Sequence, residues 1–317
     1  MDHPLPIDQR IAPQDGFRPW RQHTLKSSIS CVGVAVHSGR RVSLTLRPAE
    51  ANHGIAFRRT DLGRTIPARF DHVVDTRLAT VIADANWASA RVGMIEHLMA
   101  AFAAKGIDNA LVDVDGPELP ILDGSAGPYL FLLDCAGVTE LDAPRNIIEI
   151  RRTIRVTDGE AFAELRPMHG HVVPPVLDME VSIDFKAAAI GRQSHAMRLS
   201  EDTFRAEVAQ ARTFAQAHEI EQLRANGFAR GGSLDNAIVV DGADVLNPGG
   251  LRMDNEFARH KLLDAVGDLS LAGAALHGRF VAHRTGHGLN NKLLRALFAD
   301  QATWRQPAAQ VLEAVAA

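Results

Sequence analysis

The sequence contains little cysteine and no long apolar segment. Its two cysteines, Cys31 and Cys135, are the only ones among 317 residues, and we expect both to be reduced, buried thiols. Because there is no CxxC motif, a metal site would have to use histidine and carboxylate ligands. No run of about 18 apolar residues is present, which excludes a transmembrane helix.

An excess of basic residues is also missing. The net charge is -4 at pH 7, whereas nucleic-acid-binding proteins usually have a basic face. The first residues, MDHPLPIDQRIAPQDGF, are polar and proline-rich, and they lack the basic region and apolar core of a secretory signal. We therefore expect a cytoplasmic monomer that binds no nucleic acid and does not insert stably into a membrane. Residues 1–20 are expected to form a disordered or extended tail.

The rest of the chain has the composition of a globular protein. Apolar residues make up 46% and charged residues 23%, and the length suits two domains of roughly 150 residues each. Short β-branched runs predict strands, and helical spacing of apolar residues predicts helices. In the first half these patterns predict strands at 30–36, 42–46, 55–58 and 110–114, and helices at 93–105 and 129–135.

A second cycle of elements begins near residue 147. It is predicted to contain strands at 147–156, 161–165, 177–185 and 280–284, and helices at 201–211, 256–274 and 291–298. Leu46-Arg47-Pro48 ends a strand in the first half, and Leu165-Arg166-Pro167 ends one in the second. Each tripeptide is followed by a strand, a helix with a histidine near its start, and another strand. We therefore expect an α+β fold with two similar β-sheet-plus-helix domains, a duplicated unit, at residues 21–143 and 147–305, with an insert at about 214–250.

The strongest local pattern lies at 256–268. His260 and Asp264 are four residues apart, so on a helix they share one face, and Asp268 continues that face by another turn. A histidine and a carboxylate at this spacing can both reach one cation. The alternative is an ordinary His–Asp pair on a solvated helix face, since this spacing often occurs by chance.

Two further patterns contain histidine. Glu96 and His97 are adjacent in an otherwise apolar helix, where burying an unpaired charge is costly. A metal ligand beside a general base would explain them, and a salt-bridged glutamate beside a hydrogen-bonded core histidine is the alternative. His287 lies between two glycines after the last predicted strand, where we expect a loop that exposes the imidazole. A surface histidine without a function is the alternative there.

Two histidines and one aspartate form a three-ligand site that leaves one position open for water. Zinc prefers such a set, and ferrous iron also accepts two histidines and one carboxylate. The other ionisable residues of the three patterns would then supply a base and electrostatic help. This interpretation requires the helices at 93–105 and 256–274 to lie together in space.

At these residues the sequence closely resembles the bacterial UDP-3-O-acyl-N-acetylglucosamine deacetylases, which catalyse the committed step of lipid A synthesis. The matching segments run in the same order from about Thr24 to Leu297, and their combination is far more specific than any one of them. They are VHSG (36–39), FRRTD (57–61), EHLMAA (96–101), GIDN (106–109), DGPELPILDGS (115–125), ARTF (211–214), GGSLDNA (231–237), RHKLLDAVGD (259–268) and GHGLNN (286–291).

The resemblance implies a metal centre and a base. His97, His260 and Asp264 match the zinc ligands of the family, and Glu96 matches its general base. The implied fold has two similar α+β domains with the active site between them and a β-α-β-type insert in the second.

The resemblance also implies roles for six further residues. His287 matches a cationic histidine that assists at the scissile amide, Asp268 matches its hydrogen-bonding partner, and Thr213 matches a residue that stabilises the oxyanion. The expected substrate-binding residues are Lys261, Phe214 and His37. The insert would form a passage for the acyl chain, with apolar surface from Phe214, Ile220, Leu223, Ala237 and Ile238. The alternative is that these residues only pack the insert against its own domain.

The implied reaction is hydrolysis of the N-acetyl group of UDP-3-O-(3-hydroxyacyl)-N-acetylglucosamine to acetate and a free amine. Glu96 would remove a proton from water whose pKa the zinc ion lowers, and either Glu96 or His287 would protonate the leaving amine. One rival is a ferrous oxygenase with the same ligand set, which needs a cosubstrate site and gives Glu96 no role. Another is a non-catalytic relative, which should have lost one of the ligands or the base.

Overall fold

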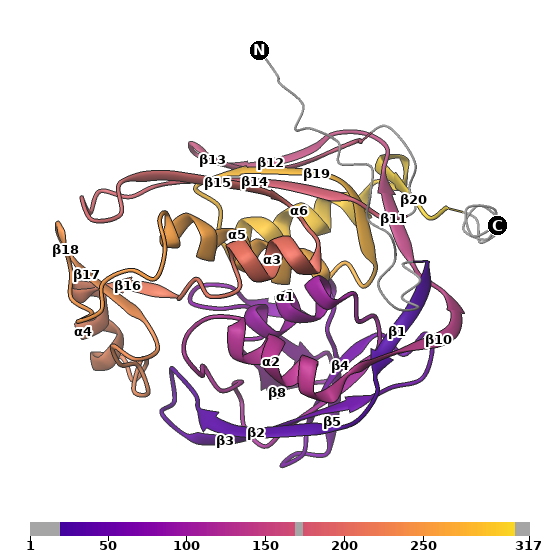
Figure 1. Ribbon diagram of the computed structural model, residues 1–317, viewed down its shortest axis with the longest axis horizontal. Coiled ribbons are helices and arrows are strands. Elements are labelled where there is room, and N and C mark those ends of the chain that lie inside the picture. Colours follow the sequence, from indigo (N-terminus) through magenta and orange to yellow (C-terminus); the bar gives the residue numbers. More distant parts are fainter. Residues whose placement is uncertain (1–19, 169–173, 308–317) are drawn as a thin grey trace.

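Two β-sheets form the outer layers of the molecule, and the main helices lie between them (Figure 1). The computed structural model describes residues 20–168 and 174–307. It has the mixed α+β architecture that the sequence predicts. The predicted tail, residues 1–20, lies outside the described residues except for Trp20.

The first sheet comes from the N-terminal half of the chain. Its side chains alternate: Val42, Leu44 and Leu46 of β3 point into the core, and the residues between them are more exposed. This alternation buries one face against helices and leaves the other in solvent. The strand order is β2 (Ile29–Val34), β3 (Arg41–Pro48), β9 (Ala110–Val114), β4 (Ile55–Arg59) and β5 (Arg64–Pro67).

The second sheet comes from the C-terminal half. In β14, Leu177, Met179, Val181 and Ile183 alternate toward the core. The corresponding strand order is β12 (Ile154–Asp158), β13 (Ala161–Arg166), β19 (Ala275–His283), β14 (Leu177–Asp184) and β15 (Arg192–Arg198), with β11 (Ile147–Ile150) paired to the start of β19 and to β20 (Trp304–Arg305).

The two sheets repeat the same pairing scheme. In the first, β2–β3, β3–β9 and β4–β5 are antiparallel and β4–β9 is parallel. In the second, β12–β13, β13–β19 and β14–β15 are antiparallel and β14–β19 is parallel. The predicted pair of similar units is therefore present, and the two Leu-Arg-Pro tripeptides lie at the ends of β3 and β13. The boundaries 21–143 and 147–305 stay a prediction.

Each half also contains a small three-stranded sheet. In the second half β16 (Phe214–Gln216) and β17 (Ile238–Asp241) are parallel and joined through α4 (Ala217–Ala225), with β18 (Asp244–Val245) beside β17. This is the β-α-β insert expected at about 214–250. In the first half the small sheet contains β6 (Val73–Asp75), β7 (Val81–Asp84) and β8 (Trp87–Val92). A ribbon of β1 (Arg21–Leu25) and β10 (Val138–Pro144) lies between the two large sheets.

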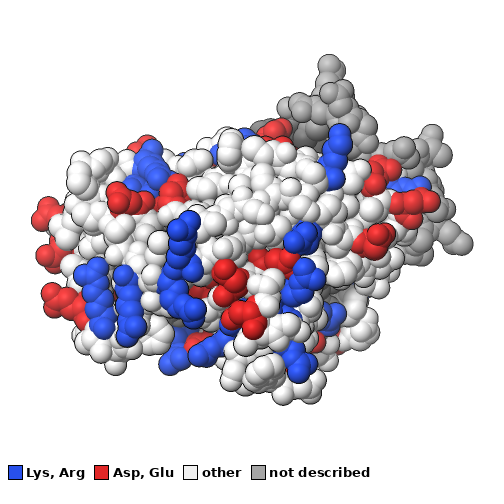
Figure 2. Space-filling model, turned by 90° about the horizontal axis from the view of Figure 1, so that it is seen from below, with Lys and Arg blue, Asp and Glu red and all other residues white. Residues whose placement is uncertain are grey.

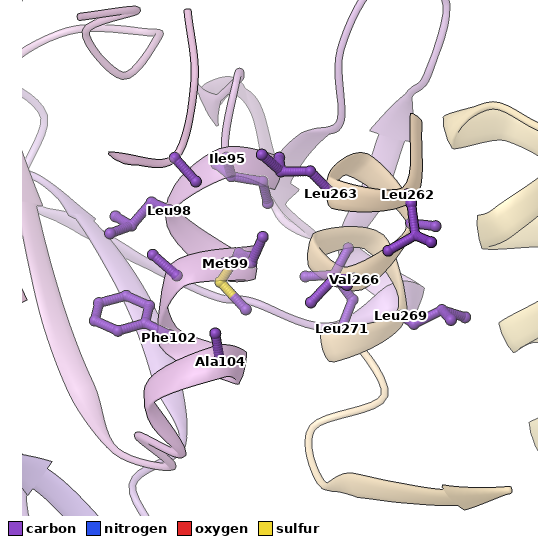
Figure 3. Packing of buried hydrophobic residues seen from close by; sticks show 14 of the residues in the cluster. Ile95, Leu98, Met99, Phe102, Ala104, Leu262, Leu263, Val266, Leu269 and Leu271 are labelled. Atoms are coloured by element: carbon purple, nitrogen blue, oxygen red, sulfur yellow. The ribbon is translucent and has the colours of Figure 1, made fainter. Parts of the chain in front are cut away.

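Helices α1 and α5 form the main contact between the two halves. Their apolar side chains, among them Met99, Leu263 and Val266, interlock in Figure 3. The backbones also approach closely, since a Cβ atom on Gly267 of α5 would lie 2.0 Å from the carbonyl oxygen of Glu96 in α1. Besides α4 of the insert, the helices are α1 (Glu96–Lys105), α2 (Gly127–Ala136), α3 (Glu201–Glu207), α5 (Glu256–Ser270) and α6 (His287–Ala299), with 3-10 turns at Phe70–His72 and Gln301–Thr303.

Several local expectations were wrong. The predicted strand at 147–156 is two strands, β11 and β12, which pair with different neighbours. Strands β5 to β8 and β15 were not predicted, because most are short and lack clear alternation. The cysteines are both free thiols, but Cys135 is exposed on α2 and Cys31 is only half-buried, so the expectation of two buried thiols fails.

The surface seen in Figure 2 mixes charges of both signs, with basic and acidic side chains interspersed among uncharged areas. No helix in the described part of the chain has the length and apolar character needed to cross a membrane.

Candidate metal centre and active site

Glu96 and His97 are the first two residues of α1. Both side chains are buried, with 2% of each residue exposed. The chain enters the helix through Met94, whose φ of 58° is in the left-handed region that apolar residues rarely adopt. Such a conformation persists only where surrounding packing holds it, and Met94 is buried against Ala79 and Ile121. The entry to α1 is thus fixed by packing rather than by a side-chain cap.

One face of α5 supplies three more ionisable side chains. His260, Asp264 and Asp268 follow one another at four-residue intervals, and each is buried. The solvated-face alternative therefore does not apply to this helix.

The two helices bring His97, His260 and Asp264 together. One ligand atom from each lies within 4.8 Å of the others. The Asp264 Oδ1 atom is 3.3 Å from His260 Nε2 and 3.6 Å from His97 Nε2. Within the described residues this buried oxygen has no hydrogen-bond partner. A cation between the three atoms would satisfy it.

Hydrogen bonds to other polar atoms of this group orient His260 and Asp264. His260 Nδ1 lies 3.0 Å from the Ala211 carbonyl oxygen, to which it can donate, leaving Nε2 free to bind a cation. Lys261 Nζ donates to Asp264 Oδ2 over 2.8 Å. Burial lowers the pKa of His260 to about 4, which favours the neutral imidazole that binds metals. Burial alone would raise the pKa of Asp264, but His260 and Lys261 hold it well below its usual range. This donor set fits zinc or ferrous iron.

His287 faces the metal group from the side of α6. Its Nε2 atom is 3.9 Å from Glu96 Oε1 and 4.0 Å from Asp264 Oδ2. The expectation of an exposed loop was wrong here: His287 is buried as the first residue of α6, because the helix begins directly after Gly286.

Asp268 holds His287 in place. Its Oδ2 atom is 2.9 Å from His287 Nδ1 and accepts a hydrogen bond of 2.8 Å from Asn290. Although burial would lower the pKa of His287, Asp268 and Glu96 raise it to about 9, so the imidazole is cationic at neutral pH.

Glu96 has different surroundings. Its Oε2 atom accepts a hydrogen bond from the Thr80 backbone N–H over 3.0 Å, and its Oε1 atom faces His287. Burial raises the pKa of Glu96 above its usual value. A carboxylate with a raised pKa next to a metal group is suited to accept a proton near neutral pH.

Thr213 and Phe214 lie beside His260. Thr213 comes two residues after Ala211, whose carbonyl group holds His260. The Thr213 backbone N–H donates to the Gly124 carbonyl oxygen over 2.8 Å. The Phe214 ring is edge-on to Phe257 at 5.0 Å and to His260 at 6.2 Å. Ile238, one of the residues expected to line an acyl passage, is fully buried in the hydrophobic core.

His37 is separate from this cluster. It follows β2, its ring is edge-on to Phe228 at 5.8 Å, and its backbone N–H donates to Glu118 over 3.0 Å. In the described ranges no hydrogen bond, ion pair or ring contact joins it to the metal group.

Comparison with known proteins decides the family. A model of the UDP-3-O-acyl N-acetylglycosamine deacetylase family matches residues 22–299. The chain belongs to this deacetylase family. UDP-3-O-acyl-N-acetylglucosamine deacetylases from Acidithiobacillus ferrooxidans and Pseudoalteromonas atlantica are 49% and 47% identical to it over 286 residues, which is 90% of this chain and 92% of each relative. The enzyme from Pasteurella multocida is 46% identical over 288 residues, 90% of this chain and 92% of its own.

In this deacetylase, two buried polar residues, Thr80 and Asn290, contact the carboxylates of the site, and the sequence did not predict either contact. Thr80 lies in a short segment without a recognisable pattern. Asn290 belongs to the GHGLNN segment, and its position three residues after His287 was the signal that it shares a helix face with that histidine.

Proposed function

We propose that the chain hydrolyses the acetamide of UDP-3-O-acyl-N-acetylglucosamine, with a metal ion held by His97, His260 and Asp264 and with Glu96 as the base. This proposal is supported by the buried Oδ1 atom of Asp264, which lies between two imidazoles and has no hydrogen-bond partner among the described residues. Beside it is a buried glutamate that is not part of the ligand set. Zinc is the proposed ion, and ferrous iron fits the same ligands. When bound, the ion supplies Lewis-acid chemistry, which lowers the pKa of water and polarises a carbonyl group.

The chain's own residues would divide the proton transfers. Glu96 takes a proton from the attacking water, whose oxygen forms a bond to the acetamide carbon. The cationic His287 would donate from its Nε2 atom to the oxyanion, with Thr213 as a further donor. When the C–N bond breaks, the amine nitrogen takes a proton from Glu96 or His287, and acetate leaves. Asp268 does not exchange protons in this scheme, because it serves to orient His287 and stabilise its charge.

We assign substrate binding to Lys261, Phe214 and His37. Lys261 and Phe214 border the metal group, with the Lys261 ammonium 5.6 Å from the Phe214 ring centre. His37 would contact a part of the substrate farther from the acetamide. Because all of these residues belong to one chain, we propose that a monomer is sufficient for activity, acting on a UDP-sugar in the cytoplasm.

One experiment distinguishes the metal ligands from the base. The purified protein should bind about one metal ion and release acetate from the acylated UDP-sugar. His97→Ala, His260→Ala and Asp264→Ala should each lose metal affinity and activity. Glu96→Gln should keep the metal but lower kcat by roughly a hundredfold or more, since it removes only the base. Metal content is measured by elemental analysis and kcat by acetate release.

Two results would contradict the assignment. Full metal occupancy in all three alanine variants would place the ion elsewhere. A Glu96→Gln protein with near-normal turnover would exclude Glu96 as the base, even with the metal site unchanged.

A further inference from the structure

Thr80 contacts two buried carboxylates that belong to opposite sides of the site. Its backbone N–H donates to Glu96 Oε2 over 3.0 Å, and its hydroxyl donates to Asp268 Oδ1 over 2.5 Å. Only 2% of Thr80 is exposed. It lies just before β7, in the small sheet of the first half, whereas Asp268 belongs to α5 in the second.

The two hydrogen bonds orient the carboxylates. With Oε2 of Glu96 held, the other oxygen, Oε1, is the one that faces His287. With Oδ1 of Asp268 held by the Thr80 hydroxyl, Oδ2 is left to face His287 and Asn290. A carboxylate held at one oxygen cannot rotate freely about its last bond, so each keeps the second oxygen toward the reaction site.

We propose that Thr80 is a positioning residue of the deacetylase, which fixes the base Glu96 through its backbone and the Asp268–His287 pair through its hydroxyl. This inference rests on the proposed function. Thr80 is not a catalytic residue, because its hydroxyl is used on Asp268 and it acts through the two carboxylates.

A pair of conservative substitutions isolates the hydroxyl. Thr80→Val keeps the shape and the backbone N–H but removes the donor to Asp268, while Thr80→Ser keeps the donor and removes a methyl group. We expect Thr80→Val to lower kcat about tenfold or more with KM within about twofold, and Thr80→Ser to restore kcat to within about threefold of the wild type. Metal content should be the same in all three proteins, because Thr80 does not contact a ligand.

Thr303 provides a matched control. It is also a buried threonine, and its hydroxyl donates to the carbonyl oxygens of Leu297 and Asp300. It lies beyond the C-terminal end of α6, whereas His287 of the site is the first residue of that helix. Thr303→Val should lower the melting temperature and leave kcat unchanged.

Three results would overturn the proposal: wild-type kcat in Thr80→Val, an equal fall of kcat in Thr80→Ser, or a fall explained by lost metal. Failure of the proposed function itself is distinguishable, since the wild-type protein would then release no acetate from the acylated UDP-sugar.

Discussion

Three acidic residues at the contact of α1 and α5 show how surroundings separate chemically similar groups. Glu96 receives one backbone hydrogen bond and is otherwise desolvated, so its pKa rises. Asp264 lies among His260, Lys261 and His97, which hold its pKa low in spite of burial. Asp268 accepts hydrogen bonds from Thr80 and Asn290 and lies beside His287. The base, the metal ligand and the orienting group that we propose therefore share one kind of side chain, and their surroundings distinguish them.

Part of this assignment of roles could be predicted from the sequence. The four-residue spacing on α5 placed His260 and Asp264 on one face without any structure. Thr80 was not accessible, because its role depends on contacts with residues 16 and 188 positions away. Such contacts leave no periodic pattern in a single sequence.

A further buried carboxylate, Asp113 of β9, stabilises the first sheet. It accepts hydrogen bonds from Arg47 of β3 and from Arg58 of β4, both 2.6 Å long. Burial alone would raise the pKa of Asp113, but the two guanidinium groups outweigh burial and lower it. Because the pKa is lower in the folded state than the value of about 3.9 in an unfolded chain, ionised Asp113 stabilises the fold above pH 4, and this stabilisation is lost as the pH falls through the lower folded value.

Asp113→Asn should therefore lower the free energy of unfolding at pH 7, and the loss should shrink below about pH 4. The expected loss is about 1 kcal/mol, since both arginine side chains are partly exposed to solvent. Denaturant unfolding at pH 7 and pH 3 measures it. Asp142→Asn removes the exposed partner of Arg21 and should have almost no effect at either pH. An equal loss for Asp113→Asn at both values would contradict the argument.

At the scale of elements, the site depends on the distance between α1 and α5. Gly267 determines that distance, because its absent side chain lets the Glu96 backbone pack directly on α5. The sequence predicted both helices and the need for them to meet. The sequence did not predict how closely the two helix backbones approach each other, because a glycine inside a helix indicates only a weak helix former.

Gly267→Ala tests this close approach. In an open helix the change would stabilise the protein by up to about 1 kcal/mol. Here the new Cβ would lie 2.0 Å from a backbone oxygen, so the helices must separate and carry His97 away from His260 and Asp264. We expect a lower melting temperature and weaker metal binding, measured by thermal unfolding and metal titration.

Val266→Ala is the matched control for Gly267→Ala. It removes two methyl groups from the apolar cluster around the same two helices and should cost about 1–2 kcal/mol of stability, while the backbones stay in contact (Figure 3). Its metal affinity should stay near the wild-type value. If Gly267→Ala binds metal as tightly as Val266→Ala, the spacing of the helices does not depend on Gly267.

At the scale of the whole molecule, the insert of the second half and its flanking residues Thr213 and Arg252 contact the first half. Thr213 N–H donates to Gly124 O over 2.8 Å, Arg252 pairs with Asp123 at 2.8 Å, and Gly231 N–H donates to Val36 O over 3.0 Å. The insert itself was predicted from the unequal lengths of the two halves. Its attachment was not, because two of these contacts join backbone atoms, which every residue except proline could supply.

Gly124 should be essential to this attachment for two reasons. Its φ is +83°, in the left-handed region, and a Cβ atom there would lie 2.1 Å from the carbonyl oxygen of Asn236 in the insert. Gly159 shares only the first property, with φ at +56° and no atom near its would-be Cβ.

Gly159→Ala should therefore cost about 1–2 kcal/mol of stability, as backbone strain alone does, and leave kcat unchanged. Gly124→Ala should cost more and should displace Thr213, which lowers kcat about tenfold or more while metal content stays constant. Thermal unfolding, metal analysis and acetate release at a temperature where both variants are folded separate these effects. A Gly124→Ala protein with wild-type kcat would mean that Thr213 keeps its place without the attachment, or that it does not act on the oxyanion.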